Sequence, residues 1–159
     1  FPEVMADKLN SNDSMLKSVK KAAQQEMPIY GECGGLMYLT RSITGYKNLK
    51  KRFRMVGIID AKTEMTGRLT LNYTQADMSS GTFGKINNIK GHEFHYSKLS
   101  ELARDTQYVY DMKRGIGIDA GMHDGIVVHN LMASYMHLHF YDRRIPTQWV
   151  KSCIKYTRR

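Results

Sequence analysis

The chain has 159 residues, 42% of them hydrophobic and 25% charged, which is enough for one domain with a buried core. No apolar run approaches the roughly 20 residues of a membrane-spanning helix, and no signal-peptide pattern opens the chain, so a cytoplasmic protein without a membrane partner is predicted. The formal net charge of +9 would suit nucleic acid, but no zinc-finger, RNA-recognition or helix-turn-helix pattern accompanies it. A nucleic-acid partner is therefore not expected.

The first elements predicted are a helix, a short strand and a second helix. Residues 12–26 form the first helix, which Pro28 ends because the residue before a proline leaves the helical region. Its apolar side chains recur at helical spacing: Met15, Val19, Ala22 and Ala23. A very short strand follows at residues 29–30, and residues 36–39 form the first turn of the next helix.

The rest of the chain is rich in predicted strands. The segments with strand-like patterns are 55–59, 68–73, 91–96, 108–110, 125–128 and 133–140. Residues 146–156 carry a helical pattern and are expected to close the chain. A helix, a strand and a second helix followed by several strands indicate an α/β sandwich with additional antiparallel strands.

The strongest chemical signal is Gly31-Glu32-Cys33-Gly34-Gly35, between the short strand and the second helix. A nucleophile at the apex of a sharp strand-to-helix turn needs nearly side-chain-free residues two before and two after it, which G-x-C-x-G provides. The helix N-terminus favours thiolate over thiol at Cys33, and the Gly34 amide would form half of an oxyanion hole. Cys33 is predicted to be a nucleophile rather than a buried structural cysteine, whereas Cys153, in the closing helix, is predicted to pack.

Six histidines offer candidates for the base that a cysteine nucleophile needs. They fall in three pairs: His92 and His95, His123 and His129, His137 and His139. On a strand, His137 and His139 would share one face, so they could also bind a metal. However, His92-Glu93-Phe94-His95 is not the helical H-E-x-x-H motif, and no other spacing supports zinc, so no metal site is predicted.

Three segments resemble hallmarks of the cobyrinic acid a,c-diamide synthase family. They are Pro28-Ile29-Tyr30-Gly31-Glu32-Cys33-Gly34-Gly35-Leu36-Met37-Tyr38-Leu39, Gly91-His92-Glu93-Phe94-His95-Tyr96-Ser97 and Ala133-Ser134-Tyr135-Met136-His137-Leu138-His139-Phe140. The resemblance implies that residues 1–159 are the C-terminal portion of a glutamine amidotransferase domain. Its implied fold is the flavodoxin-like sandwich of class I glutamine amidotransferases, with additional antiparallel strands and without its first strands.

The resemblance also implies an activity and its partners. Glutamine is hydrolysed at the cysteine, and ammonia passes to a synthetase domain of the same polypeptide, which is absent from this chain. There ATP and Mg²⁺ serve to amidate the a and c acetate side chains of cobyrinic acid, a corrinoid tetrapyrrole, in cobalamin biosynthesis; no cofactor is expected in the present portion. There are three alternatives. The same chemistry could act on nickel-sirohydrochlorin, as in close relatives; the chain could be a non-catalytic interaction module; or it could be a stand-alone cysteine hydrolase of the same fold.

The resemblance assigns roles to individual residues. It makes Cys33 the nucleophile and His137 the base, while His92, Glu93 and His95 are expected to line the glutamine pocket or support its wall. Many class I amidotransferases have a glutamate two residues after the histidine, and here that position is His139. Either His139 orients His137, or another group does so, or the triad is reduced to a dyad.

Overall fold

The computed structural model describes residues 1–46, 51–79 and 83–158. The helices in these ranges are α1 (Ala6–Ser11), α2 (Asp13–Gln24), α3 (Gly34–Leu39) and α4 (Arg144–Thr157). The strands are β1 (Ile29–Glu32), β2 (Ser42–Thr44), β3 (Arg52–Arg54), β4 (Lys62–Met78), β5 (Ile86–Ser100), β6 (Gln107–Arg114), β7 (His123–Val128), β8 (Leu131–Ser134) and β9 (His137–Leu138). None of the described helices is long and apolar enough to cross a membrane.

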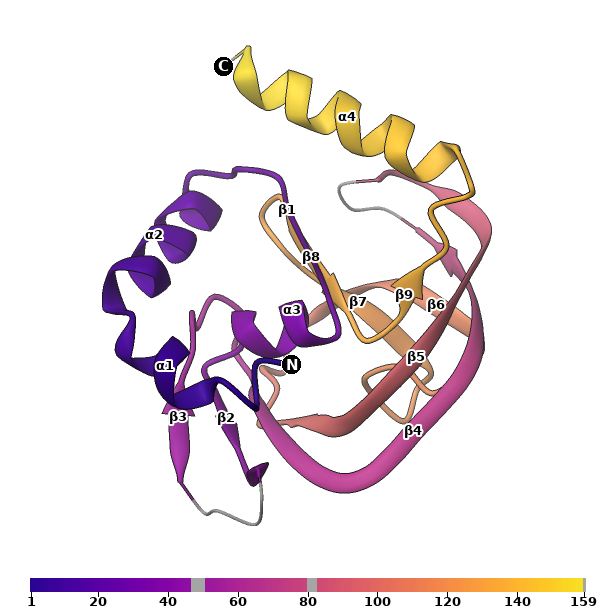
Figure 1. The fold of residues 1–159 in the computed structure, drawn as a ribbon. Helices are drawn as coiled ribbons and strands as arrows, with labels where there is room; N and C mark the ends of the chain where they lie inside the picture. Colours follow the sequence, from indigo (N-terminus) through magenta and orange to yellow (C-terminus); the bar gives the residue numbers. More distant parts are fainter. Residues whose placement is uncertain (47–50, 80–82, 159) are drawn as a thin grey trace.

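The described strands form one mixed sheet. Its order is β1-β8-β7-β6-β4-β2-β3, and β5 pairs with both β4 and β9. The pairs β1–β8 and β2–β4 are parallel, whereas the other pairs are antiparallel. In Figure 1, α1, α2 and α3 gather beside β1, β2 and β3, while α4 lies apart from them near the C-terminus. The predicted α/β architecture with additional antiparallel strands is confirmed.

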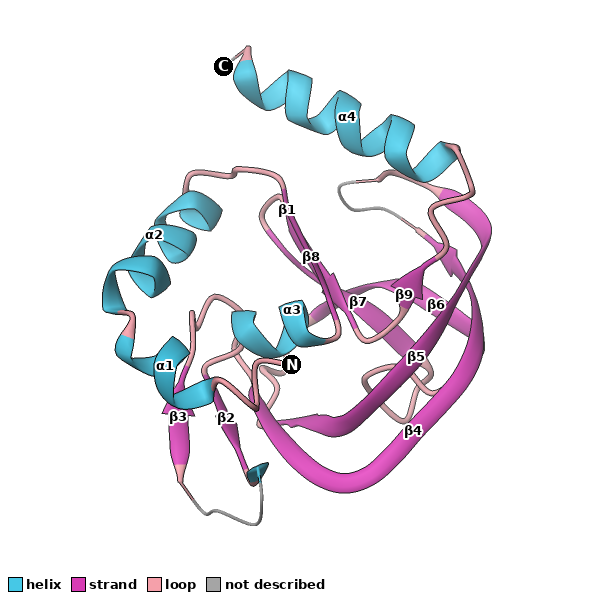
Figure 2. Cartoon of the chain, viewed as in Figure 1, coloured by secondary structure: helices cyan, strands magenta, loops and turns pink. Residues whose placement is uncertain are grey.

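Two elements dominate the antiparallel part. Strands β4 and β5 are 17 and 15 residues long and form a curved ribbon that sweeps around one side of the molecule (Figure 2). Along the C-terminal half of β5, exposed and buried side chains alternate, as the two-residue period of a strand dictates. The buried members there include three polar side chains, Glu93, His95 and Ser97. This ribbon therefore presents one polar face toward the interior.

The core consists mainly of two apolar clusters on either side of the short central strands. One joins the helices to the sheet through residues such as Leu16, Leu36 and Leu131. The other joins the ribbon to β6 and to the start of α4, through residues such as Ile89, Tyr110 and Ile145. Strand β8 contributes to both clusters, because Leu131 and Met132 point to opposite faces. Both faces of β8 are therefore buried, which fixes the strand that leads to His137.

Two predicted strands were wrong. Residues 55–59 do not join the sheet: Gly57 has a φ of +67°, and this segment bonds to Leu39 and Arg41 near the end of α3 instead. Residues 133–140 are not one strand either, because a turn separates β8 from β9. That turn bonds the amides of Tyr135 and Met136 to the buried Asp124 carboxylate rather than to a neighbouring strand.

Candidate active site

Cys33 lies at the turn between β1 and α3, in the strained conformation that an elbow requires. Its φ is +47° and its ψ is −96°, although it is not a glycine. Such backbone costs on the order of 1–3 kcal/mol and persists only where the surroundings enforce it. Here the Cys33 amide donates to the Ser134 carbonyl at 2.7 Å, which ties the elbow to the end of β8. The sequence-predicted elbow is therefore present.

Small residues allow the chain to pass close to Cys33. A Cβ on Gly31 would lie 3.0 Å from Leu39, and one on Gly34 would lie 2.9 Å from the ring of Pro2. The N-terminal residues thus pack directly against the start of α3. The Gly34 amide lies in the first turn of this helix, where amides have no intrahelical partner.

His137 meets the elbow from β9. Its side chain interacts with Cys33 and, through Nδ1, with Glu32 Oε2 at 3.3 Å. The interaction with Cys33, followed by that with Glu32, raises the pKa of His137 to about 9, although partial burial opposes this. The structure therefore brings together the two residues predicted to be nucleophile and base. A carboxylate that the sequence reasoning had not selected joins them.

Glu32 is held by three partners. The Tyr30 hydroxyl donates to Oε1 at 2.6 Å, and the Leu138 amide donates to the same oxygen at 2.7 Å. Burial acts to raise the pKa of Glu32, but the hydrogen bonds from His137, Tyr30 and Leu138 outweigh it and hold this pKa below its ordinary value. The sequence did contain a signal: Tyr30 and Glu32 are two apart on a strand, so their side chains share a face.

Asp124 is the second residue that the sequence analysis missed. It is fully buried on β7 and accepts hydrogen bonds from the amides of Tyr135 at 3.0 Å and Met136 at 2.8 Å. Burial raises the pKa of Asp124 to about 6, against the effect of these amides and that of Gly125. This carboxyl group therefore fixes the turn that immediately precedes His137. The two amides that it binds lie 11 and 12 residues further along the chain, so no local pattern marks this role.

A cavity of about 390 Å³ opens beside Cys33 and His137. It is lined by Phe1, Pro2, Glu3, Cys33, Gly34, Met37, His92, Phe94, His95, Tyr96 and His137. Its volume is within the range of small-molecule sites. The Cys33 thiol also faces the Phe94 carbonyl oxygen at 3.5 Å, so the ribbon forms the wall opposite the elbow.

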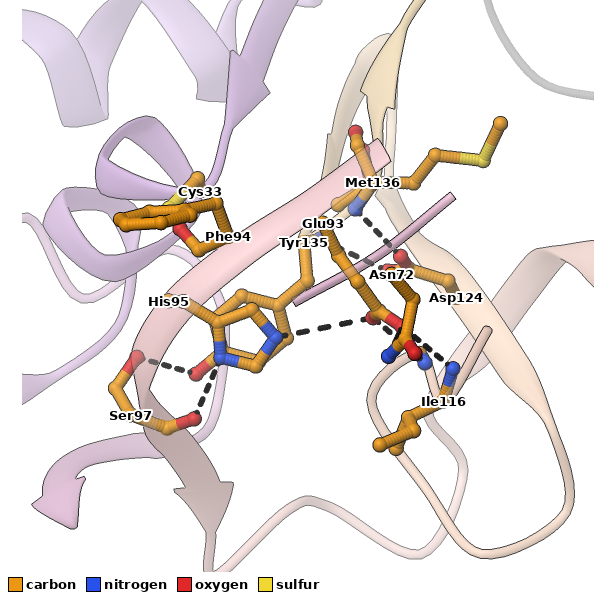
Figure 3. A network of polar contacts seen from close by, with 12 residues as sticks. Cys33, Asn72, Glu93, Phe94, His95, Ser97, Ile116, Asp124, Tyr135 and Met136 are labelled. Carbon is orange, nitrogen blue, oxygen red and sulfur yellow. Dashed lines mark hydrogen bonds and ion pairs between the residues drawn. The ribbon is translucent and has the colours of Figure 1, made fainter. Parts of the chain in front are cut away.

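The wall formed by β5 is backed by a polar network, shown in Figure 3. The His95 ring stacks on Tyr135 with centroids 3.8 Å apart, and its Nδ1 donates to the Ser97 carbonyl at 2.8 Å. His95 Nε2 lies 3.8 Å from Glu93 Oε2, beyond hydrogen-bond length. Glu93 is fully buried and accepts from Asn72, Ile116 and Gly117. Of the residues predicted for the pocket wall, His92 and His95 line the cavity, whereas Glu93 lies behind it.

His139 does not contact the imidazole of His137. It lines a neighbouring hollow that shares His92 with the cavity, together with Tyr73, Lys90 and Arg114. The two histidines do not continue one strand face, because β9 ends at Leu138. The expectation that His139 could orient His137 is therefore corrected: the Nδ1 contact belongs to Glu32. In the described ranges, no group of three or more His, Cys, Asp or Glu side chains is placed to hold a metal ion.

Comparison with known sequences places this arrangement among amidotransferases. Residues 1–145 match the family described as the CobB/CobQ-like glutamine amidotransferase domain. A cobyrinate a,c-diamide synthase of Caldanaerobacter subterraneus subsp. tengcongensis is 38% identical over 144 residues, covering 89% of this chain and 31% of the relative. The corresponding enzyme of Archaeoglobus fulgidus is 36% identical over 159 residues, covering 98% and 34%. The chain thus spans about a third of the length of these relatives.

Solved structures show the same fold. PurLQS from Thermotoga maritima superimposes with a TM-score of 0.65 at 12% identity, covering 98% of this chain and 72% of that chain. A crystal structure titled glutamine amidotransferase has a TM-score of 0.58 at 15% identity, covering 87% and 67%. The predicted class I glutamine amidotransferase-like fold is therefore confirmed.

Proposed function

Because the chain belongs to the CobB/CobQ-like glutamine amidotransferase domain family, we propose that it hydrolyses glutamine at Cys33 and supplies the released ammonia for amide formation. The observation that supports this most strongly is the position of Cys33: a strained elbow at the edge of a cavity, beside His137. A nucleophile within reach of a base that is itself held by a carboxylate is the arrangement that covalent catalysis requires.

In the first half of the reaction, the Cys33 thiolate attacks the side-chain amide carbon of glutamine. A carbon–sulfur bond forms, and the carbonyl oxygen takes the electron pair of the C=O bond, facing the Gly34 amide. The protonated His137 then gives its proton to the amide nitrogen. The carbon–nitrogen bond breaks, ammonia leaves, and a thioester with Cys33 remains.

In the second half, water attacks the thioester and His137 takes a proton from it. The carbon–sulfur bond breaks, which releases glutamate and restores the Cys33 thiolate beside protonated His137. The raised pKa of His137 suits this cycle, because the imidazole begins protonated at neutral pH. Each step needs Cys33 and His137 in contact; Cys33 directly follows β1, and His137 begins β9.

The fate of the ammonia is inferred from the names of the relatives. We propose that it reaches a synthetase domain of the same polypeptide, where ATP and Mg²⁺ serve to amidate the a and c acetate side chains of cobyrinic acid. These groups would act outside the present chain. Mass spectrometry of the product made by the full-length polypeptide from glutamine, ATP and cobyrinic acid would test this; a product without two new amides would contradict it.

The nucleophile is tested by Cys33→Ser in the full-length polypeptide. Glutamine-dependent amidation should fall by at least about 10³-fold, because a nucleophile acts as a unit with its base. Amidation from free ammonium should persist, because only the ammonia supply is lost. Cys153→Ser, which removes the other free cysteine from α4, is the matched control and should leave both activities intact. Normal glutamine-dependent turnover in Cys33→Ser would refute the assignment.

A further inference from the structure

Nδ1 of His137 is occupied by a carboxylate that comes from the residue directly before the nucleophile. Glu32 Oε2 lies 3.3 Å from it, and Glu32 ends β1, so the orienting group and Cys33 are consecutive in the chain. We propose that Glu32 is the positioning residue of this site, holding the His137 imidazole with Nδ1 protonated and Nε2 directed at the Cys33 sulfur. This inference rests on the proposed function, since it assigns a role within the same reaction.

The carboxylate is itself held in place from two directions. Oε1 accepts from the Tyr30 hydroxyl at 2.6 Å and from the Leu138 amide at 2.7 Å, which leaves Oε2 for His137. Tyr30 stays protonated because burial raises its pKa, so its hydroxyl remains a donor. The Leu138 amide belongs to the residue after His137, so the Glu32 carboxylate binds both the His137 side chain and the backbone of β9. Glu32 therefore fixes the distance between β9 and the elbow as well as the ring orientation.

The other groups near the imidazole do not compete for Nδ1. His92, opposite His137 in the β5–β9 pair, stacks on it with ring centroids 4.8 Å apart and planes 8° from parallel. A stacked ring directs its nitrogens along its own plane, away from the plane of its neighbour. Cys33 is the other side chain that interacts with the imidazole. Of these three side chains in contact with His137, Glu32 is the one that carries a carboxylate.

The charge of Glu32 has a chemical consequence for the nucleophile. A carboxylate on Nδ1 stabilises the protonated imidazole, and the protonated imidazole stabilises the thiolate at Cys33. Removing that negative charge while keeping the shape should therefore make the thiolate form only at higher pH. A residue that merely supports the fold would not produce this shift.

The test is Glu32→Gln in the full-length polypeptide, which keeps an oxygen for Tyr30 and Leu138 but not the charge. The rate of Cys33 alkylation by iodoacetamide, measured against pH, should move its midpoint upward by about one pH unit or more. The kcat for glutamine hydrolysis should fall about 10²-fold, with KM within about threefold, because the imidazole is misplaced rather than the substrate site altered.

Glu64→Gln is the matched control. Glu64 also accepts from a hydroxyl at 2.6 Å, that of Ser100, and pairs with a cation at 3.4 Å, that of Lys98, but it lies away from the cavity. This variant should keep the wild-type alkylation profile and kcat. An unshifted midpoint in Glu32→Gln would overturn the inference, whether or not turnover falls, because a loss of turnover alone would indicate a structural role.

A measurement on the unmodified protein avoids any folding defect of the variant. In histidine-labelled polypeptide, nitrogen NMR should show Nδ1 of His137 still protonated after the ring becomes neutral; a neutral ring protonated on Nε2 instead would overturn the inference. Alkylation and NMR need no glutamine. Glutamine-dependent turnover in Cys33→Ser would remove the proposed function, whereas an unshifted alkylation profile in Glu32→Gln would remove only the role of Glu32.

Discussion

The two walls of the cavity place their side chains by different means. On the elbow side, Cys33 and His137 lie next to backbone turns, one with a positive φ and one tied to Asp124. On the ribbon side, His92 and Phe94 take their places from the regular geometry of β5. A turn places a side chain through the few hydrogen bonds of that turn, whereas a long strand places its side chains through many equivalent backbone hydrogen bonds to its neighbours. Functional residues held by turns are therefore expected to be the more sensitive to change.

A buried carboxylate stands behind each wall, and the two have different charge behaviour. Asp124 holds the turn before His137, and burial raises its pKa to about 6. Glu93 holds the loop at Ile116 and Gly117; burial acts to raise its pKa too, but the proximity of His95 and the amide of Ile116 bring it below its ordinary value. Ionising the anchor on the elbow side therefore costs more free energy than ionising the anchor on the ribbon side.

The largest expected effect separates His137 from His92, which stack on each other as partners in the β5–β9 pair. His137→Ala should lower kcat for glutamine hydrolysis by about 10²–10⁴-fold, the usual contribution of a general acid–base group. His92→Ala should lower it by less than about tenfold, since this ring lines the cavity and stacks on His137 but is not the proposed base. Steady-state glutaminase assays check both variants. Equal losses of kcat would contradict the expectation that the residues held by turns are the more sensitive ones.

The two anchors give the next effect. Asp124→Asn places an amide NH₂ against a backbone N–H, which should lower stability by about 1–3 kcal/mol. It should also lower kcat by about 10²-fold, because His137 moves with the turn. Glu93→Gln should cost a similar stability but keep kcat within about threefold. Calorimetry and glutaminase kinetics on the pair decide this, and an intact kcat in Asp124→Asn would contradict it.

The pH dependence of stability should distinguish the walls more finely. The folded pKa of His137 is raised to about 9, so its contribution is fully present below about pH 6.5 and is lost as pH rises through 9. The raised pKa of Asp124 means that the folded state holds a proton which the unfolded state has released, so stability also falls between about pH 4 and 6. Calorimetric scans of His137→Ala and Asp124→Asn should each flatten one of these windows alone.

The smallest effect is expected on β4, the strand of the ribbon that contributes no lining residue to the cavity. Leu71 lies on β4 and is 60% exposed. Leu71→Ser should change stability by no more than about 0.5 kcal/mol and leave glutamine turnover unchanged. Thermal unfolding and the same kinetic assay provide the check. A large loss of turnover would mean that β4 contributes to catalysis as well as β5.

The sequence predicted the elbow because its chemistry is local. G-x-C-x-G needs only a strand before it and a helix after it, and both were visible around Gly31 and Gly35. The segment containing His92 and His95 was also predicted to be a strand, and it lies within β5. The choice of His137 as base depended partly on the expectation that its segment packs beside the cysteine elbow and partly on family resemblance. It stays a prediction, although the structure places this residue beside Cys33.

The remainder depended on contacts between distant segments. Nothing near Glu32 in the sequence announces that it meets His137, 105 positions later, because that contact exists only once β1 and β8 are paired. Asp124 was hidden for the same reason: its partners at Tyr135 and Met136 lie beyond the β7–β8 turn. The break between β8 and β9 was missed because residues 133–140 are apolar enough to read as one strand, whereas a buried carboxylate interrupts it.

Gly91 allows β5 to approach β9 more closely than any side chain would permit. A Cβ built on it would overlap the carbonyl oxygen of His137 and lie 3.0 Å from the Met136 side chain. In a saturation library scored for glutamine-dependent growth, position 91 should therefore accept glycine alone, even though it carries no chemical group of its own. A side chain at position 91 would displace the backbone of His137, so substitutions should be tolerated at neighbouring positions but not at Gly91 itself.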